Sequence, residues 1–128
     1  MLYRVTTAKD LETTSTALQE AVARHHFGVL HVHDLTQTMA RKGVEFGRAC
    51  RVFEICNPHQ AKRVLEQHIE IATALPCRIA VYEEDGGITL ATLRPSLMLS
   101  MFGPQAELQR VAVEVEEAIV AIMDEAAV

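Results

Sequence analysis

Residues 49–58 read ACRVFEICNP, a run of β-forming residues that passes directly into a helix start. Aromatic and β-branched side chains in the first part favour an extended strand. Asn57 is a preferred N-cap residue, and Pro58 suits the first helical position because no N–H is needed there. We therefore predict a strand over residues 49–56 and a helix over 58–72.

The same patterns predict the elements on either side of this segment. Alternation of side chains predicts strands over residues 2–7, 27–34, 77–84 and 87–94. Helical spacing of apolar residues predicts helices over residues 8–25, 35–42 and 104–125. The apolar connector over residues 96–102 is left without an assigned structure. The resulting order, β-α-β-α-β-α-β-β-α, predicts one α+β domain over residues 1–128.

Three local signals set the boundaries of these elements. Thr7 and Asp10 have the spacing of a capping box at the start of the first helix. Asp34 is a suitable N-cap for the short helix that follows. Residues 85–87 read DGG, which accept positive φ angles, so the strands on either side should form a hairpin.

The composition of the 128-residue chain excludes several classes of function. Hydrophobic residues make up 49% of it, enough for a buried core. With 17 acidic against 12 basic residues the formal net charge is −5, which disfavours phosphate contacts with nucleic acid. The sequence has no apolar run of about 18 residues for a membrane helix and no secretion signal. We expect a cytoplasmic protein with reduced cysteines and without nucleic-acid or membrane partners.

The strand predicted over residues 27–34 has no clear water-facing side. Strict alternation places Phe27, Val29, His31 and His33 on one face. A moderately apolar sheet face that its own helices leave open normally packs against something else. We expect this face to bind a ligand or to form the interface of a homodimer.

Two short motifs carry a family resemblance. Residues 53–58 read FEICNP, and residues 75–82, about 17 residues further on, read LPCRIAVY. Together they resemble the signature of the bacterial and archaeal family called domain of unknown function 302. The resemblance covers about residues 1–125. Arg78 stands where the family pattern leads us to expect a small polar residue.

The resemblance implies a fold of the TATA-binding-protein-like class, in which helices back one face of a curved sheet. It also implies that the chain contains one copy of the domain and that two such chains tend to pair. It implies no particular activity or cofactor, because the family has no settled one. Nucleic-acid binding does not follow from the fold, since fold does not imply function.

Cys56 directly precedes the predicted helix start, and Cys77 opens the strand after a Leu-Pro dipeptide. The N–H groups and dipole of a helix start favour a thiolate, so Cys56, Asn57, Pro58 and Cys77 are a candidate thiol site or pocket. The alternative is that Cys56 is a small packing residue in a strand-to-helix turn. If the intervening helix joins parallel strands, the two cysteines lie roughly 15–20 Å apart. They meet only if the strands are antiparallel or if another subunit supplies the partner.

His31 and His33 project from the same side of a strand and are weak candidates for metal ligands. A firm site needs a third ligand, for which Cys50 and Glu54 on a neighbouring strand are candidates. The alternative is that both histidines are half buried in a dimer face. The sequence therefore predicts no firm metal site.

Three hypotheses of function follow from these features. The first is a homodimeric module that binds a small molecule or metal at the open sheet face. The second is a thiol-dependent redox protein or enzyme that uses Cys56. The third is a module that only mediates interactions between proteins.

Overall fold

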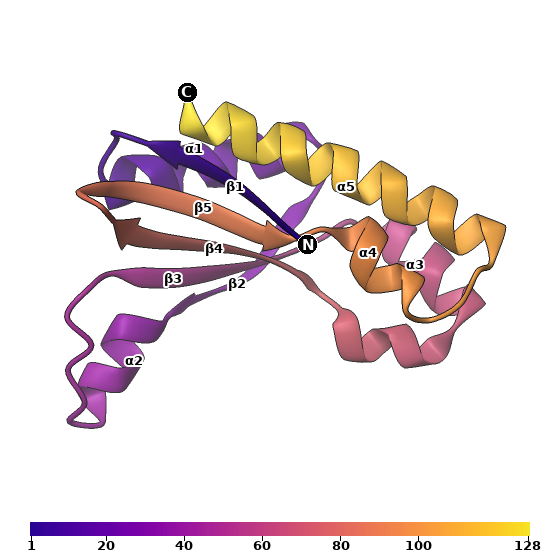
Figure 1. Cartoon of the computed structure of the whole chain (residues 1–128), viewed down its shortest axis with the longest axis horizontal. Helices are drawn as coiled ribbons and strands as arrows, with labels where there is room; N and C mark the ends of the chain where they lie inside the picture. The colour runs from indigo at the N-terminus through magenta and orange to yellow at the C-terminus, as the bar shows by residue number, and fades with distance from the viewer.

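The computed structural model of the chain describes all residues, 1–128, and shows five strands, five α-helices and one 3-10 helix (Figure 1). Their bounds in chain order are β1 (Leu2–Thr7), α1 (Leu11–Arg24), β2 (Gly28–Asp34), α2 (Leu35–Arg41), β3 (Cys50–Cys56), α3 (Pro58–Gln67), η1 (Ile69–Ala74), β4 (Cys77–Glu84), β5 (Gly87–Leu93), α4 (Pro95–Ser100) and α5 (Ala106–Ala127). The predicted order of strands and major helices is confirmed, with η1 and α4 added.

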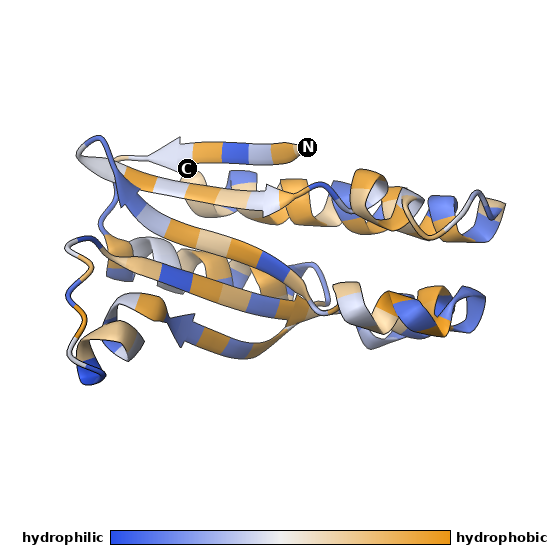
Figure 2. Cartoon of the chain, turned by 60° about the horizontal axis from the view of Figure 1, so that its bottom comes forward, coloured by the Kyte–Doolittle hydropathy of each residue, from blue (hydrophilic) through white to orange (hydrophobic).

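All five strands form one open antiparallel sheet with the spatial order β1-β5-β4-β3-β2. Helices α1 and α5 cover one face of this sheet (Figure 1). Figure 2 looks onto the opposite face, which no helix covers along the length of the strands. We call it the open face. The expected α+β architecture, with helices on one side of a single sheet, is confirmed.

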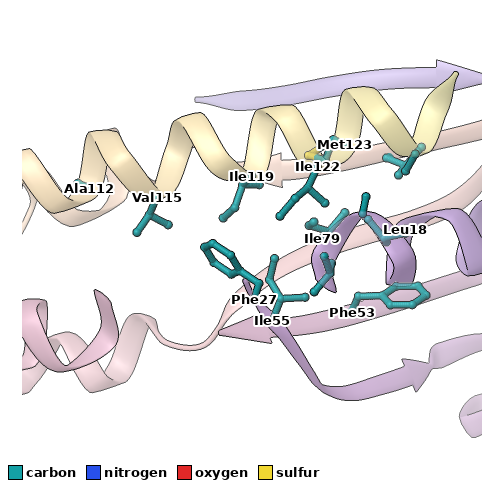
Figure 3. Close-up of a cluster of buried hydrophobic side chains, with 14 of the residues drawn as sticks. Leu18, Phe27, Phe53, Ile55, Ile79, Ala112, Val115, Ile119, Ile122 and Met123 are labelled. Carbon is teal, nitrogen blue, oxygen red and sulfur yellow. The ribbon is translucent and has the colours of Figure 1, made fainter. Parts of the chain in front are cut away.

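The core lies between the sheet and helices α1 and α5 (Figure 3). Phe53, Ile55 and Ile79 project from β3 and β4 and are fully buried. Helical spacing brings Ile119 and Ile122 of α5 onto the same side, where they meet these strand residues. This burial fixes which face of β3 and β4 points inward and leaves the alternate residues on the open face.

Helices α3 and α4 and the turn η1 extend beyond one end of the sheet, where they pack against one another and α5 (Figure 1). The helix expected over residues 58–72 ends at Gln67, because His68 adopts an extended conformation with φ −159° and ψ 105°. The 3-10 helix η1 follows it. The connector over residues 96–102 contains α4, which Pro95 begins.

Two of the three predicted helix caps are confirmed. Asn57 accepts hydrogen bonds from the backbone N–H groups of His59 and Gln60 and so caps α3, with Pro58 in the first turn. Asp34 caps α2 in the same way. The helix expected from residue 8 begins instead at Leu11, because Asp10 is its N-cap and Thr7 still belongs to β1.

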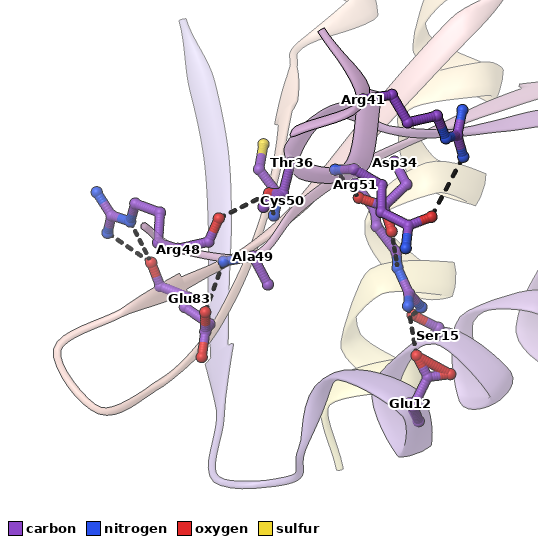
Figure 4. A network of polar contacts seen from close by, with 11 residues as sticks. Glu12, Ser15, Asp34, Thr36, Arg41, Arg48, Ala49, Cys50, Arg51 and Glu83 are labelled. Carbon is purple, nitrogen blue, oxygen red and sulfur yellow. Dashed lines mark hydrogen bonds and ion pairs between the residues drawn. The ribbon is translucent and has the colours of Figure 1, made fainter. Parts of the chain in front are cut away.

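Polar contacts attach the α2 end of β3 to the rest of the molecule (Figure 4). Arg51 lies on the helix side, where its Nη1 donates to Ser15 Oγ at 3.1 Å and its Nη2 pairs with Glu12, both on α1. Thr36 Oγ1 of α2 accepts a hydrogen bond from the Cys50 N–H at 2.9 Å. The Arg51 contacts join β3 to α1, and the Thr36 hydrogen bond joins β3 to α2, which buries no residue of its own.

The predicted hairpin between β4 and β5 is confirmed. Asp85 and Gly86 adopt left-handed φ angles of 51° and 79°, and Glu84 pairs with Gly87. A two-residue turn of this kind sets the register along both strands.

The strict alternation expected for β2 is wrong, because the strand contains a bulge. Val29 pairs with Ile55 and His31 pairs with Glu54, so Leu30 is the extra residue and is 62% exposed. Phe27 and Val29 therefore pack on the core side, whereas His31 and His33 lie on the open face. The four residues do not share one face.

Candidate functional site

One row of side chains crosses all five strands on the open face. It runs in the spatial order His33, Val52, Ala80, Ala91 and Arg4, as the registers of the four strand pairs show. The two alanines face each other directly across β4 and β5. Because both side chains end at Cβ, the middle of the open face is lower than its surroundings.

A hollow of about 340 Å³ lies over these two alanines. Its volume is at the lower end of the range for small-molecule sites, about 300–1,000 Å³. The lining is mainly apolar and comes from four strands, η1 and α4: Leu2, Val52, Ala74, Cys77, Ala80, Tyr82, Ala91, Leu93 and Met98. Pro76, Pro95, Thr92 and Arg78 complete it. The sheet therefore carries a concave apolar site on the face that its own helices leave uncovered.

Arg78 is the one charged residue that lines the hollow. Its side chain is 56% exposed, and its Nη2 lies 3.4 Å from Oε2 of Glu54, its cross-strand partner on β3. Thr92 Oγ1 donates a hydrogen bond to the Arg78 carbonyl oxygen at 2.7 Å. The guanidinium is thus at the boundary between the hollow and a polar edge of the sheet.

That polar edge consists of Arg78, Glu54 and the two histidines of β2. His33 Nε2 lies 3.0 Å from Glu54 Oε1, and the His31 ring meets the His33 ring edge-on at a centroid distance of 4.3 Å. The contact with His33 lowers the pKa of Glu54, and Arg78 adds to this effect, whereas partial burial opposes it. Glu54 therefore carries its negative charge at neutral pH.

The structure does not assemble a metal site around the histidines. Nowhere in the chain do three or more His, Cys, Asp or Glu side chains lie in positions to hold one ion. Of the candidate third ligands, Glu54 contacts His33 and is shared with Arg78. Cys50 lies further along β3, opposite Tyr82.

The two candidate thiols lie at the same end of the sheet. β3 and β4 are antiparallel with Ile55 opposite Cys77, so Cys56 is one residue beyond that pair. Of the two arrangements that the sequence left open, the structure has the antiparallel one, which brings the cysteines to the same end. Cys56, Asn57 and Cys77 line a second, much smaller cavity of about 30 Å³, into which Pro58 does not reach. All three cysteines of the chain are free thiols.

Burial opposes ionisation of these thiols. It raises the pKa of Cys77 to about 11 and also raises the pKa of Cys56. The position before a helix start predicts a lowered pKa for Cys56, whereas burial raises it in the structure. The geometry around Cys56 is thus that of a packed thiol rather than of an activated nucleophile.

The chain as a whole matches a known family. The model of the family described as domain of unknown function DUF302 matches residues 3–126. The chain belongs to the DUF302 family. A similar solved structure is the crystal structure of an uncharacterized conserved DUF302 protein from Bacillus stearothermophilus, with a TM-score of 0.92 and 28% sequence identity over 98% of this chain and 97% of that chain. No curated protein matches the chain.

The motifs that carried the DUF302 resemblance border both cavities. In the LPCRIAVY segment, Leu75 lines the small cavity, Arg78 and Ala80 line the hollow, and Cys77 lines both. Arg78, the departure noted in the sequence, is the residue that gives the hollow its charge. The LPCRIAVY segment of the family signature therefore lines the hollow, whereas the FEICNP segment borders only the small cavity.

The sequence did not point to Ala80 and Ala91 as site residues. One signal for them was present, because the Asp85-Gly86 turn implies a register that sets Ala80 opposite Ala91. The walls that Met98 and Ala74 provide had no such signal, since they depend on how α4 and η1 pack.

No helix of this DUF302 chain combines the length and the apolar character that crossing a membrane requires.

Proposed function

We propose that this DUF302 chain is a binding module that holds a small apolar molecule in the hollow on the open face. The observation that carries the proposal is the facing pair Ala80 and Ala91, which leaves about 340 Å³ free over the middle of the sheet. Removal of the apolar surface of a concave site from water is the usual driving force for ligand binding.

An uncharged fluorescent probe tests this proposal directly. N-phenyl-1-naphthylamine becomes bright in apolar surroundings. We expect saturable binding to the wild-type chain and loss of binding in Ala80→Leu, whose larger side chain fills the hollow. The matched control Ala23→Leu adds the same side chain at an exposed position of α1 and should bind as the wild type does.

Two results would overturn the proposal. One is the absence of saturable binding by the wild-type chain. The other is equal binding by Ala80→Leu and wild type, which would place the probe elsewhere. Circular dichroism melting curves of each variant verify that the comparison is made between folded proteins.

We also propose that two copies of the chain associate. The support is the cross-strand pair Leu2 and Leu93 at the rim of the hollow, both nearly half exposed on a face that nothing in the chain covers. Light scattering at micromolar concentration should show a dimer, and Leu93→Ser should shift it towards monomer. Val113→Ser removes a similarly exposed apolar side chain from α5 and should leave the dimer intact. A monomeric wild type would contradict this proposal.

The thiol hypothesis has less support than the binding hypothesis. Its candidate nucleophile Cys56 has a raised pKa, and the cavity that it shares with Cys77 holds only about 30 Å³. A chain that forms a dimer but binds no probe would support the third hypothesis, a module that only mediates interactions.

A further inference from the structure

We propose, on the basis of the function proposed above, that the molecule held in the hollow is an amphiphile with an apolar body and a single anionic group that pairs with Arg78. The body would lie over Ala80 and Ala91, and the anionic group would lie at the polar edge of the sheet.

The charge of the lining supports an anion. Arg78 is the only charged side chain that lines the hollow, and no carboxylate lines it. An apolar cavity with one cationic side chain favours a ligand that has a negative charge at one end and disfavours a ligand that is cationic there. A single guanidinium also matches one anionic group rather than several.

Arg78 has bonding capacity to spare. Its guanidinium has five N–H donors, and its one close carboxylate contact is the 3.4 Å approach of Nη2 to Glu54. The side chain is 56% exposed, so a ligand can reach the remaining donors. A carboxylate suits this planar group because it can accept two parallel hydrogen bonds.

The shape of the hollow supports an apolar body next to that anchor. Ala80 follows Arg78 by two residues on β4, so both side chains project from the same face. Pro95 and Met98 of α4 wall the hollow at the sheet end where Arg78 lies, and Tyr82 lines it two residues beyond Ala80 on β4. A linear chain that starts at Arg78 would therefore pass over the two alanines and remain within apolar walls.

Three probes of the same length separate charge from hydrophobicity. Isothermal titration calorimetry at pH 7.5 compares decanoate, 1-decanol and decylammonium, each below its micelle or solubility limit. We expect decanoate to bind more tightly than decanol, and decylammonium to bind most weakly. Arg78→Gln should weaken decanoate binding about tenfold while leaving decanol binding unchanged, and Arg78→Lys should retain part of the preference.

Arg4 provides the matched control. It is exposed on the same face, in the row that contains both alanines, but it does not line the hollow. Arg4→Gln removes the same charge and should leave the preference for decanoate in place. An equal loss in Arg4→Gln and Arg78→Gln would overturn the assignment to Arg78.

Failure of this inference differs from failure of the proposed function. Equal affinity for decanoate and decanol, unaffected by Arg78→Gln, would refute the anionic class and leave a site for apolar molecules. A preference for decylammonium would refute it as well. Absence of binding by all three probes, together with no binding of N-phenyl-1-naphthylamine, would refute the site itself.

Discussion

Glu54 and Arg78 are cross-strand partners on the open face, with Glu54 Oε2 3.4 Å from Arg78 Nη2. The carboxylate is only 17% exposed, and it also contacts His33. It therefore lies where it competes with any anionic ligand for the Arg78 guanidinium.

Removing this competing charge should strengthen the binding of an anion. In Glu54→Gln the amide keeps the size of the side chain but no longer neutralises Arg78. We expect decanoate to bind about threefold more tightly, as the loss of an ion pair of ordinary strength would allow, and decanol to bind unchanged. Calorimetry measures both. Weaker binding of decanoate would show that Glu54 orients Arg78 instead of competing for its ligands.

Glu116 should control the wall of the hollow through α4. Its Oε1 accepts hydrogen bonds from the Ser96 N–H at 3.0 Å and the Ser96 hydroxyl at 2.6 Å, so a residue of α5 caps the start of α4. In Glu116→Ala we expect faster amide hydrogen exchange across α4 and weaker probe binding, because Met98 forms part of the lining. Glu117→Ala on the exposed side of α5 serves as the control, and equal exchange in both variants would contradict the role of Glu116.

The same contact predicts a pH dependence. Burial raises the pKa of Glu116, but the hydrogen bonds from Ser96 and the charge of Arg94 outweigh it, so the pKa is lowered overall. A carboxyl whose pKa is lower in the folded than in the unfolded chain stabilises the fold fully above about pH 4.3, and this stabilisation is lost as the pH falls below that value. Melting temperatures should therefore drop less between pH 5 and 3 in Glu116→Gln than in wild type. Parallel pH profiles would disprove the effect.

The bulge in β2 predicts opposite sensitivities for neighbouring residues. Val29 packs against the core, whereas Leu30 is 62% exposed. Val29→Ala should lower the free energy of unfolding by about 1 kcal/mol, and Leu30→Ala should change it by less than about 0.5 kcal/mol. Urea denaturation measures both values, and the reverse order would show that the strand alternates without a bulge.

The thiols should react slowly in the native protein. Burial raises the pKa of Cys77 to about 11 and raises those of Cys56 and Cys50. At pH 7.5 we expect iodoacetamide to alkylate all three far more slowly than it does in urea, with Cys77 the slowest. Mass spectrometry over time gives the separate rates. Rapid native alkylation of Cys56 would revive the thiol hypothesis.

Local signals in the sequence predicted most of the fold because they act over a few residues. Asn57 with Pro58, and Asp85 with Gly86, specify a helix start and a hairpin turn through their own backbone preferences. The bulge at Leu30 had no such signal, since an extra residue in a strand is defined by its pairing with β3. Two residues of the expected ligand face, Phe27 and Val29, therefore lie on the core side instead.

Local sequence signals also did not determine the relative direction of β3 and β4. The helix that follows Cys56 fits either a parallel crossover or an antiparallel return, and the packing of β4 beside β3 decides between them. The cysteines are therefore adjacent, and the hollow arises over a register that involves four strands. Its charge depends on Arg78, which the sequence marked only as a departure from the family pattern.

Chemical shift changes on binding show where a probe lies on the folded chain. Two-dimensional ¹⁵N NMR spectra of the chain, titrated with decanoate, report which backbone amides change their environment. A ligand in the hollow should produce saturable shifts concentrated at Val52, Ala80, Ala91 and Met98, with Ala80→Leu abolishing them. Shifts concentrated on the outer surfaces of α1 and α5, or no saturable shifts at all, would contradict a binding site on the open face.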